Sequence, residues 1–327
     1  MLVIGEVRTC LLQNSTAATR TEVAELLRLA PGERVRTSER PVARAVSPDV
    51  LNGVDCLVPA RSGTRVRGVG TVTGRAVVTG GRVLQGSVCT RLDHGELDRR
   101  LPWSHYLSRP GVIETTGRFD RPDLTAGFFA DEGSESTLDL GALSDRVIAS
   151  VQTNSRLDHA IPFKSKRTQL RWAVWTDESH MTGARGEFIV ADDTLRTFSL
   201  ALEGDAGPEV VELCEDLALH DWVLSTVSQL VERSGIGSTD GPETLTKLRP
   251  AIDHLLHLWM PGARVADSLR PLWESLERWP GFTKQWQSTV ARIRDQIAVH
   301  TLGMLSRLRT AAPELVENGG GSVGRQR

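Results

Sequence analysis

The hydrophobic positions follow two different patterns, and the change falls near residue 205. Across residues 35–92, β-branched residues alternate with polar ones between frequent glycines and prolines, as is typical of β-strands. Within residues 66–88, Gly80-Gly81 separates two alternating runs and predicts a two-residue hairpin turn. Further strands are expected at residues 1–12, 146–151, 170–175, 187–191 and 195–202. We therefore expect residues 1–205 to form a β-rich domain, arranged as a meander or a sandwich.

Helical spacing replaces this alternation in the rest of the chain. Pro208 opens a segment in which apolar residues recur three, four and seven positions apart as far as Val231. Three more helical segments are predicted, and short Pro-Gly turns link them; they cover residues 245–259, 265–279 and 282–308. The pattern predicts an antiparallel, bundle-like helical domain at residues 206–312, followed by a disordered, glycine-containing tail at 313–327.

One short helix is also expected inside the β-rich part, at residues 21–29. Thr19 or Thr21 can cap its start, and Pro31-Gly32 ends it. Residues 93–145 hold many prolines, glycines and acidic positions, so most of that region is expected to be loop. The elements together predict the α+β class.

The composition is that of an ordinary globular protein. Apolar residues make up 39% of the 327 residues, and the formal net charge is −2, so no polyanionic partner is required. The four cysteines are far apart and form no C-x-x-C pair, which indicates reduced thiols. The N-terminal segment lacks the features of a signal peptide, and no apolar run is long enough for a membrane span. We expect a cytoplasmic protein.

Lysines are rare in this chain, and two of its four lie in one short segment. Lys164, Lys166 and Arg167 form a basic cluster just before a predicted strand. Ammonium and guanidinium groups at this spacing are typical of sites for phosphate or acidic peptides. The alternative is a solvated surface loop.

The histidines suggest chemistry without defining it. His254 and His257 share one face of a predicted helix, but two ligands do not make a metal site, so no metal or other cofactor is predicted. His94, His105, His159 and His180 have hydroxyl or carboxylate neighbours in sequence, yet no nucleophile motif accompanies them. The glycines of residues 68–74 lie in a strand pattern rather than at a strand-to-helix turn, so they do not predict a phosphate loop.

Tryptophans are concentrated in the helical part, which carries five of the eight; they are Trp222, Trp259, Trp273, Trp279 and Trp286. Aromatic side chains anchor cores and also supply much of the binding energy at protein interfaces. Most of the five are expected in the core. Trp222, Trp259 and Trp279 are the candidates for contact with a partner.

Four blocks of the sequence carry a resemblance to known proteins; they are residues 5–12 (GEVRTCLL), 59–86, 102–107 (PWSHYL) and 214–222 (CEDLALHDW). In these blocks the chain resembles an uncharacterised family of actinobacterial proteins. Members of such families look to be encoded beside a variant P-loop protein similar to the ParA/MinD type. The resemblance implies membership of a small multi-protein system and assigns no functional residue.

Three function classes follow from these observations. The first is a non-enzymatic adaptor or assembly component that binds a neighbour-encoded protein, with the P-loop protein as one candidate. The alternative is an enzyme, a hydrolase or transferase, that holds a phosphorylated or acidic substrate with the basic cluster. A nucleic-acid binder comes third: five arginines along the predicted meander (Arg61, Arg65, Arg67, Arg75 and Arg82) suggest a basic stripe, but no aromatic residues accompany them there.

Overall fold

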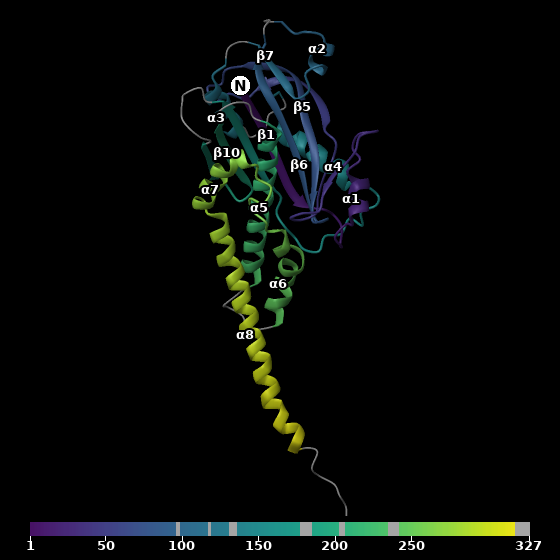
Figure 1. Ribbon diagram of the computed structural model, residues 1–327, viewed down its shortest axis with the longest axis vertical. Helices are drawn as coiled ribbons and strands as arrows, with labels where there is room; N and C mark the ends of the chain where they lie inside the picture. The colour runs from purple at the N-terminus through teal and green to yellow at the C-terminus, as the bar shows by residue number, and fades with distance from the viewer. Residues whose placement is uncertain are drawn as a thin grey trace, which may run out of the picture.

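The fold is known from a computed structural model (Figure 1). It describes residues 1–95, 99–116, 119–130, 136–176, 185–202, 207–234 and 242–317, and all their side chains except those of 242–243 and 307–317. Within these ranges the chain forms ten strands and eight α-helices, which confirms the α+β class. None of the helices described is both long and apolar enough to cross a membrane.

All ten strands belong to one mixed sheet, rather than to the two packed sheets of a sandwich. The strands are β1 (Leu2–Leu11), β2 (Arg36–Ser38), β3 (Arg44–Val46), β4 (Val50–Val58), β5 (Val66–Thr79), β6 (Val83–His94), β7 (Val112–Thr116), β8 (Thr168–Thr176), β9 (Arg185–Val190) and β10 (Leu195–Leu202). Their order is β2-β3-β5-β7-β6-β1-β8-β10-β9, with β4 and β6 also paired to β5. The β6–β7 and β8–β10 pairs are parallel and the others antiparallel.

The predicted hairpin is confirmed, with a connection one residue longer than expected. Thr79 pairs with Val83, so Gly80, Gly81 and Arg82 join β5 to β6. Both glycines have a positive φ, of +60° and +61°. A Cβ atom on Gly81 would lie 2.1 Å from the Ala18 carbonyl oxygen, so a glycine is required here for space as well as for backbone conformation.

Eight α-helices and two short 3₁₀ helices, η1 (Leu256–Leu258) and η2 (Asp267–Leu269), complete the fold. The α-helices are α1 (Arg20–Leu26), α2 (Trp103–Leu107), α3 (Arg121–Ala130), α4 (Leu140–Gln152), α5 (Pro208–Ser234), α6 (Pro242–His254), α7 (Arg270–Arg278) and α8 (Phe282–Glu317). At α1, the Thr19 hydroxyl accepts from the Glu22 amide, and the Glu22 carboxylate accepts from the Thr19 amide. The predicted helix and its Thr19 cap are therefore confirmed, but the helix ends at Leu26 rather than at residue 29.

The prediction of a strand at residues 146–151 is wrong, because this segment lies inside α4. Asp139 caps the helix through the Ala142 amide, 2.8 Å away. The buried residues Ser144, Val147 and Val151 recur at helical spacing and face the sheet. Val147, Ile148 and Val151 are β-branched, and their spacing is also compatible with a strand. The region expected to be mostly loop also holds α2, β7 and α3.

Helices cover both faces of the sheet (Figure 1). On one face α4 packs on β1, β5 and β6, and α1 contributes to the same core cluster. On the other face α5 packs on β1, β6 and β8, while α6 and α8 pack on α5. The second core therefore contains strand residues such as Trp172 together with helix residues such as Trp222. The change of sequence pattern near residue 205 therefore marks where strands give way to helices, and both parts contribute to this core. Residues 203–206 lie outside the described ranges.

Helix α8 is much longer than the layer it packs on. Its 36 residues span about 54 Å, and Figure 1 shows it leaving the body beyond α5 and α6. It continues to Glu317, past the predicted end of the helical part at residue 312. The rest of the predicted tail, residues 318–327, lies outside the described residues.

Candidate functional site

The first half of α8 is held in the core. Phe282, Trp286 and Ile293 are between 2% and 8% exposed. The Trp286 ring stacks on Trp259, with centroids 4.4 Å apart and planes 6° from parallel. This half of the helix is fixed by contacts with its own chain.

In the second half of α8 the apolar residues keep the same spacing, but no other part of the described chain covers them. Trp286, Val290, Ile293, Ile297 and Met304 fall on the alternating steps of four and three that define a heptad seam. Ile297 is 37% exposed and Met304 is 49% exposed. Other apolar side chains around this half are also exposed; they are Val299, Leu302 and Leu305. A helix that is apolar on several sides is normally buried, so this surface is the strongest candidate for a protein interface.

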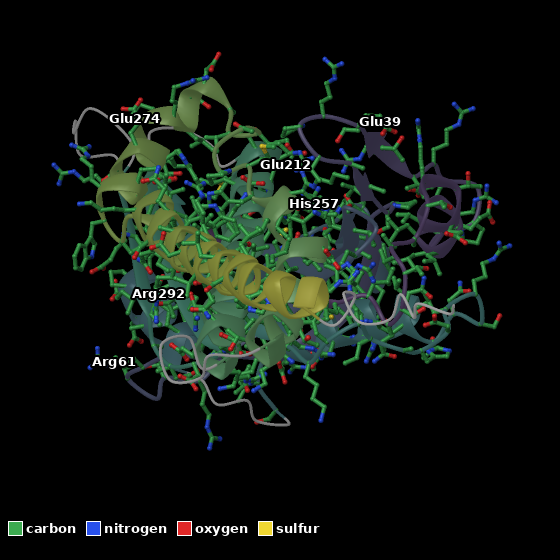
Figure 2. All side chains as sticks on the ribbon, turned by 90° about the horizontal axis from the view of Figure 1, so that it is seen from below. Glu39, Arg61, Glu212, His257, Glu274 and Arg292 are labelled. Carbon is green, nitrogen blue, oxygen red and sulfur yellow. The ribbon has the colours of Figure 1, made fainter. Side chains whose placement is uncertain are left out.

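Positive charges flank the seam where it leaves the body. Arg292 and Arg294 lie on either side of Ile293, and both are exposed (Figure 2 labels Arg292). Neither makes an ion pair with a residue whose side chain is described. Asp295 is the one acidic residue on this part of the helix up to Ser306. The flanks are therefore suited to acidic groups.

The candidate tryptophans occupy different environments. Trp222 is fully buried, and its indole N–H donates to the Lys166 carbonyl oxygen at 2.9 Å. It anchors α5 to the sheet and is not available to a partner in this fold. Trp259 is half-buried under Trp286. Trp279 is 81% exposed at the turn that begins α8.

A buried histidine ties α5 to the segment after η1. The Met260 amide donates to His220 Nε2 at 3.3 Å, so this nitrogen carries no proton. The proton is then on Nδ1, which donates to the Asp216 carbonyl oxygen at 2.7 Å. His220 is 1% exposed and packs edge-on against Trp259. It therefore serves as a structural link between α5 and the segment after η1.

The three cations of the basic cluster do not converge on one site. Lys166 Nζ lies 2.6 Å from Asp193 Oδ2, on the connection between β9 and β10. Arg167 Nη1 lies 2.5 Å from Asp145 Oδ1, on α4. Lys164 is exposed. Two of the charges are thus neutralised by carboxylates on different elements.

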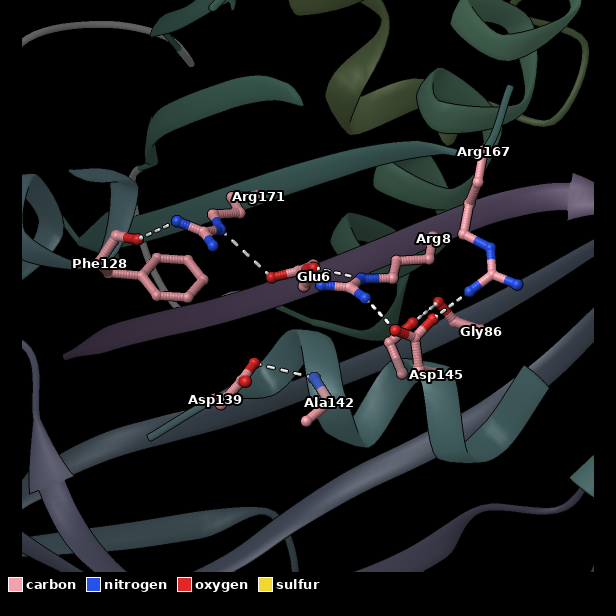
Figure 3. A network of polar contacts seen from close by, with 10 residues as sticks. Glu6, Arg8, Gly86, Phe128, Asp139, Ala142, Asp145, Arg167 and Arg171 are labelled. Atoms are coloured by element: carbon pink, nitrogen blue, oxygen red, sulfur yellow. Dashed lines mark hydrogen bonds and ion pairs between the residues drawn. The ribbon is translucent and has the colours of Figure 1, made fainter. Parts of the chain in front are cut away.

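Figure 3 shows that Arg167 belongs to an ion network on the α4 face of the sheet. Asp145 also binds Arg8, and Arg8 Nε donates to Glu6 Oε1 at 2.8 Å. Arg171 reaches the other oxygen of Glu6 at 3.3 Å and the Phe128 carbonyl oxygen at 3.1 Å. The network joins β1, β8, α3 and α4, so its charges are used inside the fold.

Two of the five arginines of the predicted meander are buried rather than part of a surface stripe. Arg75 is buried and binds Glu215 on α5 through Nε and Nη2, at 2.7 and 2.9 Å. Arg82 is 4% exposed and donates to the Asn14 and Ser15 carbonyl oxygens. Arg67 pairs with Asp55 at 2.8 Å. Arg75 and Arg82 are therefore used inside the fold, whereas Arg61 and Arg65, like Arg67, are exposed.

Within the described part of the chain, the histidines considered as candidates from the sequence do not come together in one site. His105 Nε2 is 2.8 Å from Glu114 Oε1, and His254 stacks on Phe163. His180 lies outside the described residues. Among the residues described, no group of three His, Cys, Asp or Glu side chains is placed to hold a metal ion. All four cysteines are free thiols.

Comparison of the chain with models of protein families, with curated proteins and with solved structures finds no match in any of the three. The function is therefore inferred from the residues and contacts of this chain alone. Among them, the uncovered half of α8 is the feature that its own fold does not explain.

Proposed function

We propose that the protein is a non-enzymatic adaptor or assembly component, and that it binds an amphipathic helix of a partner protein along residues 294–306 of α8. One observation carries this proposal. The heptad seam that packs against the chain's own body at Trp286 and Ile293 continues, at the same spacing, through the exposed Ile297 and Met304. A helix seam of this kind is matched by another helix.

The charges favour a different protein over a second copy of this chain. Arg292 and Arg294 flank the seam, and a second copy crossing at this turn would bring like charges together. A partner helix with acidic flanks would instead gain charge-assisted contacts and faster association. The variant P-loop protein implied by the sequence resemblance is the candidate partner.

The test is co-expression of the full chain with that P-loop protein, followed by affinity measurement. Exchanging Ile297 and Met304 together for serine should weaken the complex roughly tenfold or more, because apolar residues at the centre of an interface carry much of its energy. Ala291→Ser with Ala298→Ser is the matched control, since both alanines are exposed and lie outside the seam. This control should leave the affinity unchanged.

Charge reversal provides an independent check. Arg292→Glu with Arg294→Glu should weaken the complex and reduce its sensitivity to salt. Three results would contradict the proposal: no complex with the P-loop protein, a complex unaffected by the seam variant, or a homodimer of the isolated chain that the seam variant dissolves. Light scattering of the purified chain distinguishes the third result from the others.

A further inference from the structure

A hollow lined by arginines lies at the β2 edge of the sheet, away from α8's exposed half. It has a volume of about 370 Å³ and lies between the β2–β3 pair, the start of α5 and residue 264. Its charged lining consists of Arg36, Arg40, Arg44, Arg264 and Glu212. In the view of Figure 2, Glu212 and Glu39 mark this side of the body, and Arg61 marks the opposite side. Four arginines and one glutamate thus line the hollow.

Only one of the arginines that line the hollow is paired with a carboxylate among the described residues. Arg44 Nη2 lies 2.5 Å from Glu215 Oε2, and the same carboxylate also binds Arg75. Burial alone would raise the pKa of Glu215, but the two guanidinium groups hold this pKa below its ordinary value. Glu215 is therefore ionised at neutral pH and holds Arg44 in place beside the hollow.

Arg264 is a partly buried cation with no carboxylate bound to it among the described residues. Its Nη2 donates to the Val42 carbonyl oxygen. Burial lowers the pKa of Arg264, and the like charge of Arg44 lowers it further, against the opposing effects of Asp216 and Glu212. An additional anion in the hollow would relieve this repulsion.

The other two arginines are open to solvent. Arg36 and Arg40 are exposed, and neither forms an ion pair within the part of the chain that the structure describes. Arg36, Arg40 and Arg264 are therefore the lining arginines without a carboxylate partner among the described residues. Thr37 and Ser38 also line the hollow.

A second, larger pocket of about 540 Å³ shares Thr37, Ser38 and Arg44 with the hollow. Apolar side chains contribute much of its lining, among them Val23, Val42, Val78 and Met260. An oxyanion site beside an apolar pocket suits a ligand with one charged end and one apolar end.

We propose that the arginine-lined hollow binds the phosphate group of a small organic phosphate, whose apolar portion lies in the adjoining pocket. Guanidinium groups hold phosphate oxygens through paired N–H donors, and several around one hollow match the charge of a phosphate dianion. This site is independent of the partner interface on α8, so neither proposal depends on the other.

The test is calorimetric titration of the full chain with inorganic phosphate, phenyl phosphate and benzoate at low salt. Phenyl phosphate should bind one-to-one and more tightly than inorganic phosphate, and benzoate should bind weakest. Arg264→Gln should weaken phenyl phosphate binding roughly tenfold or more, and Arg36→Gln and Arg40→Gln roughly threefold to tenfold each. Arg233→Gln is the matched control, because Arg233 is an exposed arginine outside the hollow, and it should change nothing.

Arg36 and Arg40 are exposed, so their variants test the site even if Arg264→Gln lowers the stability of the fold. Absence of binding by phenyl phosphate would overturn the proposal. Equal weakening by Arg233→Gln would also overturn it, because the binding would then be non-specific. Tighter binding of benzoate would assign a carboxylate site in place of the small phosphate.

Discussion

The two halves of α8 have the same spacing of apolar residues and opposite surroundings. Trp286 and Ile293 in the first half are covered by α5, α6 and the Trp259 segment, whereas Ile297 and Met304 in the second half are exposed. Spacing alone therefore shows that a helix face is built to be covered. It does not show whether the cover comes from the same chain. This contrast, between side chains that are covered by their own chain and side chains that are not, can be tested by substitution.

The largest effect is expected at the buried charge under α5. Glu215→Gln removes the anion shared by Arg44 and Arg75 and leaves two buried guanidinium groups without it. Removing one partner of a buried ion network typically costs about 3–5 kcal/mol. Urea unfolding should show a loss of this size. Asp145→Asn, in the more exposed network of Figure 3, should cost less than about 1 kcal/mol. Equal losses of unfolding free energy for the two variants would show that burial does not make the Glu215 network more important for stability than the Asp145 network.

The next largest effect is expected from a matched pair of tryptophans. Trp286→Ala removes a ring stacked on Trp259 in the covered half of α8 and should cost about 3 kcal/mol. Trp279→Ala removes a ring that is 81% exposed and should change stability by less than about 0.5 kcal/mol. Thermal or urea unfolding measures both. A large loss for Trp279→Ala would mean that this side chain stabilises the fold despite its exposure.

A smaller effect is expected from acidification. The pKa of Glu215 is lower in the folded chain than its ordinary value of 4.5, because Arg75 and Arg44 outweigh the effect of burial. Its contribution to stability is therefore complete above about pH 4.5 and is lost as the pH falls through the folded value. The difference in unfolding free energy between the wild type and Glu215→Gln should shrink across that acidic range. A difference that stays constant there would exclude ionised Glu215 as its source.

Local signals in the sequence predicted local structure well. The Thr19 cap, the Gly80-Gly81 hairpin and the Pro208 helix start depend on residues close together in the chain, and the structure confirms all three. The strand expected at residues 146–151 is wrong because three β-branched residues also fit one face of α4. Over so short a segment the two periodicities are not distinguishable.

Features that depend on distant residues could not be predicted. The arginine-lined hollow joins Arg36 and Arg44 to Arg264, more than two hundred positions later, and no spacing rule links them. The basic cluster was visible in sequence, but Asp193 and Asp145 approach Lys166 and Arg167 only in the fold. The density of charge along the chain therefore suggested a shared site at Lys166 and Arg167, where there is none, and gave no sign of the arginine-lined hollow. Only tertiary pairing decides which cations are already neutralised.

The smallest effect on stability is expected in the exposed half of α8, where the contrast between its halves is most direct. Ile297→Ser and Met304→Ser should each change the unfolding free energy of the isolated chain by less than about 0.5 kcal/mol, because neither side chain is buried. Ile293→Ser, one turn earlier and 2% exposed, is the matched control and should cost several times more. When the partner is bound, the ranking of these three variants by loss of stability should change, because Ile297→Ser and Met304→Ser would then also remove binding energy. A loss above about 1 kcal/mol for Met304→Ser in the isolated chain would mean that this half already packs on something within it, and the adaptor proposal would lose its main support.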